Sequence, residues 1–288
     1  MPGWSLSSPQ INSSGKILFV GHNERPFRLG RIYCTNRPTS IFATSVSNFK
    51  AEIKQITGDE FATNTPRFIS ENDFIYFRRA PWGPHADYHD LMICKNSEHR
   101  ILVAADQKLP LQENKDKFPG IFLVGDNIFH YDNWLYLTTL WRNHHAIIEI
   151  DLTDGDVRPV NFDDSVSRKI FRYRALFLLS LLQKMYHSDC LLDIDSNGEL
   201  LVKESSHLQP DQLVTFGVRD ETLRTRDELF SNIPPFAVDS KFEQKILHSK
   251  DASNECFHCH GLVSESAKSI IMFIHGGPHR YGLSITLS

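Results

Sequence analysis

The stretch Pro9-Gln10-Ile11-Asn12-Ser13-Ser14-Gly15-Lys16-Ile17-Leu18-Phe19-Val20 places a polar turn between two runs of strand-forming residues. Such a pattern predicts a β-hairpin, because asparagine and glycine adopt turn conformations and the flanking residues favour extended backbone. Three further stretches have the same pattern, at residues 66–77, 129–137 and 191–202. Hairpins are therefore expected to recur along most of the chain.

The four turns lie at Gly15, Asn72, Asn133 and Gly198, which are 57, 61 and 65 residues apart. Most copies are followed by another strand pair, most clearly at residues 147–157, where Asp-Gly forms the turn. Propeller blades of four strands recur at roughly 40 to 50 residues, and at more with long loops. We expect a mainly β chain with about four blades of a partial β-propeller; a β-sandwich with similar turns is the alternative.

Two prolines in the stretch Ser231-Asn232-Ile233-Pro234-Pro235-Phe236 indicate a domain boundary. Residues 1–235 are expected to form the partial propeller. Residues 167–188 favour helix and interrupt its rhythm, as a helical insertion or as an error in the gene model. Residues 236–288 are expected to begin an α/β-hydrolase domain, because the continuous apolar run at residues 270–274 predicts a strand buried on both faces.

The residues His275-Gly276-Gly277-Pro278-His279 follow this apolar run directly. A strand that ends in His-Gly-Gly supplies half of the oxyanion hole in many α/β-hydrolases, because the glycines let a backbone N–H approach the reacting carbonyl. A plain structural turn is the alternative. No Gly-x-Ser-x-Gly occurs in the 288 residues, so the expected nucleophile is missing from this sequence. The chain is expected to end just after the oxyanion loop.

Two other patterns suggest ligands. Cys256-Phe257-His258-Cys259-His260 matches the c-type haem attachment pattern, and its cysteines and a histidine are also zinc ligand types. No second Cys-x-x-Cys exists, and a plain β-strand is the favoured interpretation. Residues 193–198 resemble the start of a calcium loop, with Glu204 at its twelfth position, but strand-forming neighbours favour a hairpin turn. We therefore expect neither a metal nor a cofactor.

Composition indicates a soluble globular protein, with 41% hydrophobic and 23% charged residues. The net charge of −4 gives no reason to expect nucleic acid or an acidic membrane as a partner. Five scattered cysteines are typical of a reducing compartment. The first residues do not resemble a signal peptide, and the longest apolar run, residues 175–182, is too short to span a membrane. A cytoplasmic location is expected.

Two groups of residues resemble the acylaminoacyl-peptidases (acylamino-acid-releasing enzymes), which belong to the prolyl-oligopeptidase class of serine peptidases. Phe27-Arg28-Leu29-Gly30 with Cys34-Thr35-Asn36-Arg37 is similar to a stretch of their propeller. Residues 271–279 resemble the start of their hydrolase domain. The resemblance runs patchily from about Ser8 to His279, with no counterpart for residues 167–188.

The resemblance implies a seven-bladed propeller that caps an α/β-hydrolase domain with a Ser-Asp-His triad. Enzymes of this family release N-acylated, typically N-acetylated, amino acids from short peptides, and are generally cytosolic homo-oligomers. It also implies that the N–H of Gly277 binds the oxyanion, while Gly276 and Pro278 fix the turn between His275 and His279. The early blades and the triad residues have no counterpart in the chain. The chain alone is therefore expected to be inactive; a non-enzymatic propeller-like binding module is the alternative.

Overall fold

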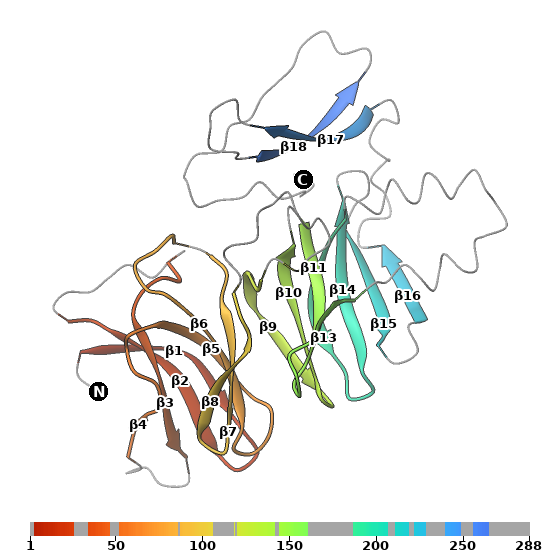
Figure 1. The fold of residues 1–288 in the computed structure, drawn as a ribbon. Coiled ribbons are helices and arrows are strands. Elements are labelled where there is room, and N and C mark those ends of the chain that lie inside the picture. The colour runs from red at the N-terminus through yellow and green to blue at the C-terminus, as the bar shows by residue number, and fades with distance from the viewer. Residues whose placement is uncertain are drawn as a thin grey trace. The chain divides into compact units, whose positions relative to one another are not determined.

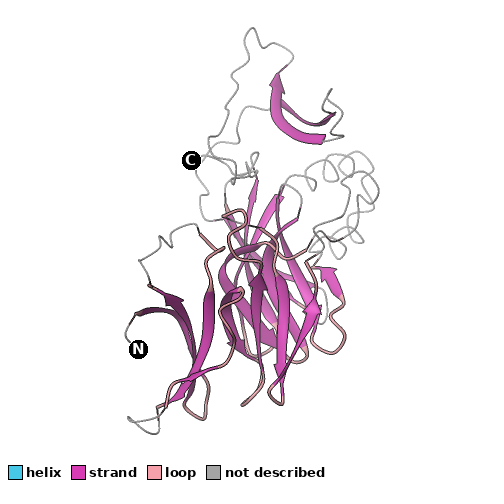
Figure 2. Ribbon diagram, turned by 60° about the vertical axis from the view of Figure 1, so that its left-hand side comes forward, coloured by secondary structure: helices cyan, strands magenta, loops and turns pink. Residues whose placement is uncertain are grey.

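The computed structural model describes residues 3–25, 34–46, 52–85, 87–105, 118, 120–141, 144–160, 187–206, 211–218, 222–228, 240–248 and 256–264. The regular secondary structure of these described residues consists of β-strands alone (Figures 1 and 2). The chain divides into two compact units, which we describe separately. One contains Met1–Lys108, Phe118–Leu135 and Ile150–Arg158, and the other contains residues 109–117, 136–149 and 159–288.

The first sheet is an antiparallel meander whose strands follow chain order, β1-β2-β3-β4. Asn12 closes the turn between its first two strands, because its Oδ1 accepts hydrogen bonds from the N–H groups of Ser14 and Lys16. Gly15 completes this turn at a φ of +78°, a conformation that glycine adopts without strain. The hairpin predicted at residues 9–20 is confirmed. The strands are β1 (Trp4–Ile11), β2 (Lys16–Asn23), β3 (Thr39–Ser45) and β4 (Lys54–Gln55).

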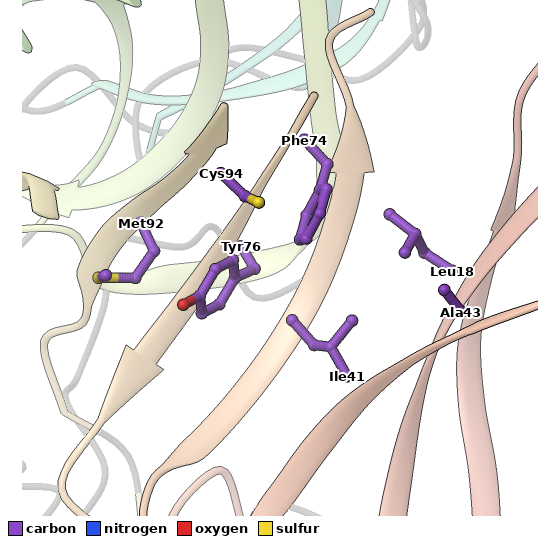
Figure 3. Close-up of a cluster of buried hydrophobic side chains, with 7 residues drawn as sticks. All are labelled: Leu18, Ile41, Ala43, Phe74, Tyr76, Met92 and Cys94. Carbon is purple, nitrogen blue, oxygen red and sulfur yellow. The ribbon is translucent and has the colours of Figure 1, made fainter. Parts of the chain in front are cut away.

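The second sheet repeats this meander as β5-β6-β7-β8. Its inner residues pack against the first sheet in one buried cluster, shown in Figure 3. Dense packing of such apolar side chains provides most of the free energy that holds two sheets together. The strands are β5 (Ala62–Phe68), β6 (Phe74–Arg79), β7 (Asp90–Lys95) and β8 (Glu98–Val103). The cluster contains Leu18, Ile41 and Ala43 from the first sheet and Phe74, Tyr76, Met92 and Cys94 from the second.

The third sheet, in the order β12-β11-β10-β9, contributes residues to both units. Its β11 and β12 form the Asp-Gly hairpin predicted at residues 147–157, and Gly155 adopts a φ of +84° in the turn. The turn predicted at Asn133 is also present, between β9 and β10. The strands are β9 (Leu123–Tyr131), β10 (Trp134–Trp141), β11 (His144–Asp151) and β12 (Val157–Pro159).

The fourth sheet, β13-β14-β15-β16, lies in the second unit. Asp195 shapes its first turn, because its Oδ1 accepts hydrogen bonds from the N–H groups of Asn197 and Glu199. These backbone bonds hold the pKa of Asp195 below its usual value. The hairpin turn predicted at residues 193–198 is therefore confirmed. Glu204, the twelfth position of the alternative calcium loop, is buried within a strand. The strands are β13 (His187–Ile194), β14 (Glu199–Ser206), β15 (Gln212–Gly217) and β16 (Thr222–Glu228).

The helix predicted at residues 167–188 extends too far, because His187 and Ser188 already belong to strand β13. Its remaining residues lie outside the described part of the chain, as do the predicted boundary at 231–236 and the apolar run at 270–274. A two-stranded antiparallel sheet pairs β17 (Ser240–His248) with β18 (Cys256–Ser264). The strand predicted for Cys256 to His260 is thus confirmed.

Candidate functional site

The first strand of each four-stranded sheet is irregular at a corresponding place. In β1 and β5 the pairing shifts by one residue around Ser8 and Thr65, and both residues adopt a φ of +50° before a proline. In β9, Gly125 has a φ of +135°, and in β13 the register shifts between Leu191 and Asp193. Bulges of this kind bend a strand and occur often beside functional sites. Positive φ is unfavourable for a β-branched residue such as Thr65.

Three of these irregular positions line one cavity in the first unit, with a volume of about 250 Å³. Ser8, Thr65 and Gly125 each contribute to its wall, so three first strands converge there. The rest of the wall comes from neighbouring strands and from the segment before β3. Most of its exposed surface is apolar, with Val20 and Leu123 contributing, but several polar side chains are set into it. It includes Ser7, His22, Thr39, Thr63, Asn64 and Asp126, together with Cys34, Thr35 and Arg37.

The Cys34–Arg37 segment is held against the loop that follows β6. Asn36 donates to the carbonyl of Gly83 at 2.6 Å and accepts from the N–H of Trp82 through its own carbonyl at 2.9 Å. Thr35 donates twice to the carbonyl of His85, through its N–H at 3.0 Å and its hydroxyl at 2.9 Å. These bonds between segments some 45 to 50 residues apart fix the Cys34–Arg37 backbone at the cavity wall.

Arg79 also anchors the Cys34–Arg37 segment and the loop that follows β6. Its Nη1 donates to the hydroxyl of Thr35 at 3.2 Å, and its Nη2 donates to the carbonyl of Pro84 at 2.7 Å. The guanidinium also pairs with Asp87 at 3.7 Å. Burial lowers the pKa of Arg79, which Asp87 opposes. A nearly buried cation therefore has acceptors on several sides, as burial of a charge requires.

Asn64 has a fixed orientation in the wall. Its Nδ2 lies 3.3 Å from Nε2 of His89. Burial, and next the charge of Arg79, lower the pKa of His89 to about 3. The amide nitrogen of Asn64 can only donate, so Nε2 of His89 is the acceptor, with the proton of the neutral imidazole on Nδ1. Oδ1 of Asn64 then points elsewhere. That Oδ1 is buried without a hydrogen-bond partner.

Threonine hydroxyls and one arginine brace the other walls. The N–H of Thr63 donates to the hydroxyl of Thr39 at 2.6 Å, and the hydroxyl of Thr63 donates to the carbonyl of Thr39 at 3.0 Å. Nη2 of Arg67 donates to the backbone carbonyl of Asp126 at 2.6 Å. The first, second and third sheets thereby each contribute polar groups at fixed positions. A largely apolar wall with a few polar groups at fixed positions is typical of a site for a small ligand.

The sequence-predicted oxyanion turn, His275 to His279, lies outside the described residues. Among the residues that the structure does describe, no group of three or more histidine, cysteine or acidic side chains could hold a metal ion. Nor does a helix long and apolar enough to cross a membrane occur among them. The sequence analysis did not predict the cavity. The pairs Ser8-Pro9 and Thr65-Pro66 could have indicated it, because a proline within a strand is typical of a bulge.

Comparisons with known proteins relate the chain to one class of peptidase. No protein-family model matches it. It is 29% identical to the acylamino-acid-releasing enzyme of Arabidopsis thaliana over 57% of its own length and 24% of that enzyme. It is 23% identical to acylamino-acid-releasing enzyme 2 of Oryza sativa subsp. japonica over 93% of its length and 39% of that enzyme. The chain thus spans well under half of these curated relatives.

Among solved structures, a prolyl endopeptidase matches 93% of the chain with a TM-score of 0.56 and 10% identity, over 32% of its own chain. Oligopeptidase B from Trypanosoma brucei matches 93% of the chain with a TM-score of 0.55 and 9% identity, over 33% of its own. The chain therefore has the fold of one part of prolyl-oligopeptidase-type peptidases. Within that class, its curated relatives are acylamino-acid-releasing enzymes, which confirms the resemblance predicted from the sequence.

Proposed function

We propose that the four meander sheets are blades of a β-propeller within residues 1–235, and that residues 236–288 begin an α/β-hydrolase domain. The strand order supports this, because blades are four-stranded antiparallel meanders. The cavity adds support, since a propeller turns the first strand of each blade toward its central channel. Three such strands, β1, β5 and β9, line the cavity.

We further propose that this chain is part of an acylaminoacyl-peptidase of the serine type, which acts on short N-acylated peptides. The observation that carries this is the match of 93% of the chain to an acylamino-acid-releasing enzyme. The turn at His275 to His279 supplies the oxyanion loop in this proposal, with the N–H of Gly277 as donor and with Gly276 and Pro278 fixing the backbone. An oxyanion hole binds the negative charge of the tetrahedral intermediate but does not attack the carbonyl.

The 288 residues contain no Gly-x-Ser-x-Gly, so they provide no serine on a nucleophile elbow. We propose that this polypeptide by itself binds acylated peptides and leaves them intact, because without a nucleophile no acyl-enzyme forms. A cytosolic location and assembly into homo-oligomers are part of the same proposal, by resemblance to the family.

A peptide-binding experiment tests the acyl preference. The purified 288-residue chain would be titrated calorimetrically with Ala-Ala-Ala-amide bearing an N-acetyl group or a free amine. We expect tighter binding of the acetylated peptide, because the unacetylated peptide must remove its terminal ammonium group from water on binding. Equal affinity for the two peptides, or preference for the free amine, would exclude an acylaminoacyl-peptidase scaffold.

A non-enzymatic binding module is the second candidate. It is favoured by one observation: the described residues that line the cavity all belong to the first unit, and ligand binding there needs no catalytic serine. Transcript sequence separates the two candidates. An in-frame Gly-x-Ser-x-Gly downstream of Ser288 supports the peptidase, whereas a confirmed stop codon with stable expression supports the binding module.

A further inference from the structure

Arg37 projects a guanidinium group at the cavity wall without a carboxylate partner among the described residues. Its Nη2 lies 3.9 Å from Sγ of Cys34, and its guanidinium carbon lies 5.7 Å from the ring centre of Trp82. Its Nε is buried and makes no hydrogen bond. A weak thiol contact and an aromatic face orient this cation, and the part of the chain that the structure describes offers its other donors no acceptor.

Three neighbouring arginines differ from Arg37 in this respect. Arg78 pairs with Asp90 at 3.3 Å, and Arg79 pairs with Asp87. Arg67 donates to two backbone carbonyls. Among the described residues of the first unit, these arginines thus have strong acceptors, whereas Arg37 has none. A half-buried guanidinium that lacks an acceptor is suited to an anionic ligand, above all to a carboxylate, whose two oxygens match its planar fork.

Asn64 offers a hydrogen-bond acceptor in the cavity where Arg37 offers donors. Because His89 fixes its amide group, its buried Oδ1 is an acceptor in the same cavity wall. A ligand that presents a carboxylate beside an N–H donor would satisfy both side chains. The last residue of a peptide has this arrangement, since its carboxylate and its amide N–H are attached to one Cα.

We propose that this cavity binds the C-terminal carboxylate of a short peptide, with Arg37 pairing with the carboxylate and Asn64 accepting the last peptide N–H. The inference rests on the proposed function, because an acylated N-terminus carries no charge. The C-terminal carboxylate is then the one ionised end of such a peptide. Recognition of that end would select short peptides, since a long chain does not present its C-terminus close to its N-terminus.

Four peptides test this inference on the 288-residue chain: Ala-Ala-Ala with an acetylated or free N-terminus, each with a free carboxylate or a C-terminal amide. We expect amidation to weaken binding by about 10- to 100-fold, the effect of losing a charged hydrogen-bonded partner. The Arg37→Gln variant should bind the acid and the amide with similar affinity, so that the wild-type preference for the acid is lost. Arg100→Gln, at an exposed arginine of strand β8, is the matched control and should keep wild-type affinities.

Asn64→Asp provides a second variant, because it adds a negative charge to the cavity that would hold the carboxylate and should weaken binding of the acid more than binding of the amide. Circular dichroism and urea unfolding would confirm that each variant is folded. Equal binding of acid and amide by the wild-type chain would overturn the inference, as would its failure to bind either. A carboxylate effect without an acetyl effect would instead refute the acylaminoacyl preference, so the two proposals fail separately.

Discussion

Asn64 and His89 form a polar pair at the cavity wall, with Nδ2 of Asn64 3.3 Å from Nε2 of His89. His89 is 2% exposed, and its backbone N–H donates to the carbonyl of Ile121 at 2.8 Å. The pair therefore depends on His89 remaining neutral, which links the cavity to pH.

The stability of the protein should fall as the pH is lowered. The pKa of His89 is about 3 in the folded chain against 6.5 ordinarily, so the unfolded chain binds a proton below pH 6.5 that the folded chain does not. Stability linked to His89 is full above pH 6.5 and is lost progressively toward pH 3. At pH 5 the loss is about 2 kcal/mol.

Urea unfolding of the wild type and of His89→Gln at pH 7 and pH 5 measures this contribution. Other histidines titrate in both proteins, so the difference between the two pH dependences isolates His89. Glutamine keeps an acceptor for Asn64 but does not titrate. Parallel pH dependences in the two proteins would show that His89 is not buried as a neutral base.

Arg79 should matter more to stability than an exposed arginine that also pairs with aspartate. Arg79→Lys retains the charge but loses the fork that reaches Thr35 and Pro84, which should cost about 1–3 kcal/mol. In the control, Arg158→Lys alters a pair with Asp156 in which both side chains are more than half exposed. That change should cost at most about 1 kcal/mol. Similar unfolding midpoints for the two variants would contradict the anchoring role of Arg79.

Phe77, on strand β6, is 0% exposed and should be among the costliest residues to truncate. Phe77→Ala leaves a cavity in the sheet packing and should destabilise the chain by about 3–5 kcal/mol. Ile11→Ala, at a side chain that is 63% exposed, is the comparison and should change stability by about 0.5 kcal/mol or less. Denaturant unfolding monitored by tryptophan fluorescence gives both values, and a small loss for Phe77→Ala would argue against this core.

Gly155 should tolerate no side chain. It adopts a φ of +84°, and an added Cβ would lie 2.2 Å from the carbonyl oxygen of Leu102. Gly155→Ala should therefore destabilise the chain by about 1–3 kcal/mol or more. Gly83→Ala is the control, because the atom nearest to an added Cβ there is Nη2 of Arg79 at 3.4 Å, an ordinary van der Waals contact. Equal melting temperatures for the two variants would show that the Asp-Gly turn differs from this geometry.

The turns of the meanders were predictable because their causes are local. Asn12 and Asp195 each accept hydrogen bonds from N–H groups two and four residues further along the chain. Gly15 and Gly198 supply the positive φ that each hairpin needs. Residue type and spacing are sufficient to indicate such features.

The cavity was not predictable, because its contacts join distant segments. Arg37 lies beside Trp82, and Asn64 depends on His89. The stretch Cys34 to Arg37 resembles a part of the acylaminoacyl-peptidase propeller, but no local pattern in it indicates that it lines a cavity. The bulges at Ser8 and Thr65 are likewise visible only as Ser-Pro and Thr-Pro within strand-like sequence.

The central claim is that these 288 residues belong to a peptidase scaffold but lack its nucleophilic serine. The most direct test is whether the purified chain hydrolyses acetyl-alanine p-nitroanilide. This substrate has an acylated N-terminus and no carboxylate, so the result does not depend on Arg37. We predict no release of p-nitroaniline above the buffer rate and no labelling by a fluorophosphonate. Steady release that a fluorophosphonate abolishes would contradict this, because it would place an activated serine within the chain.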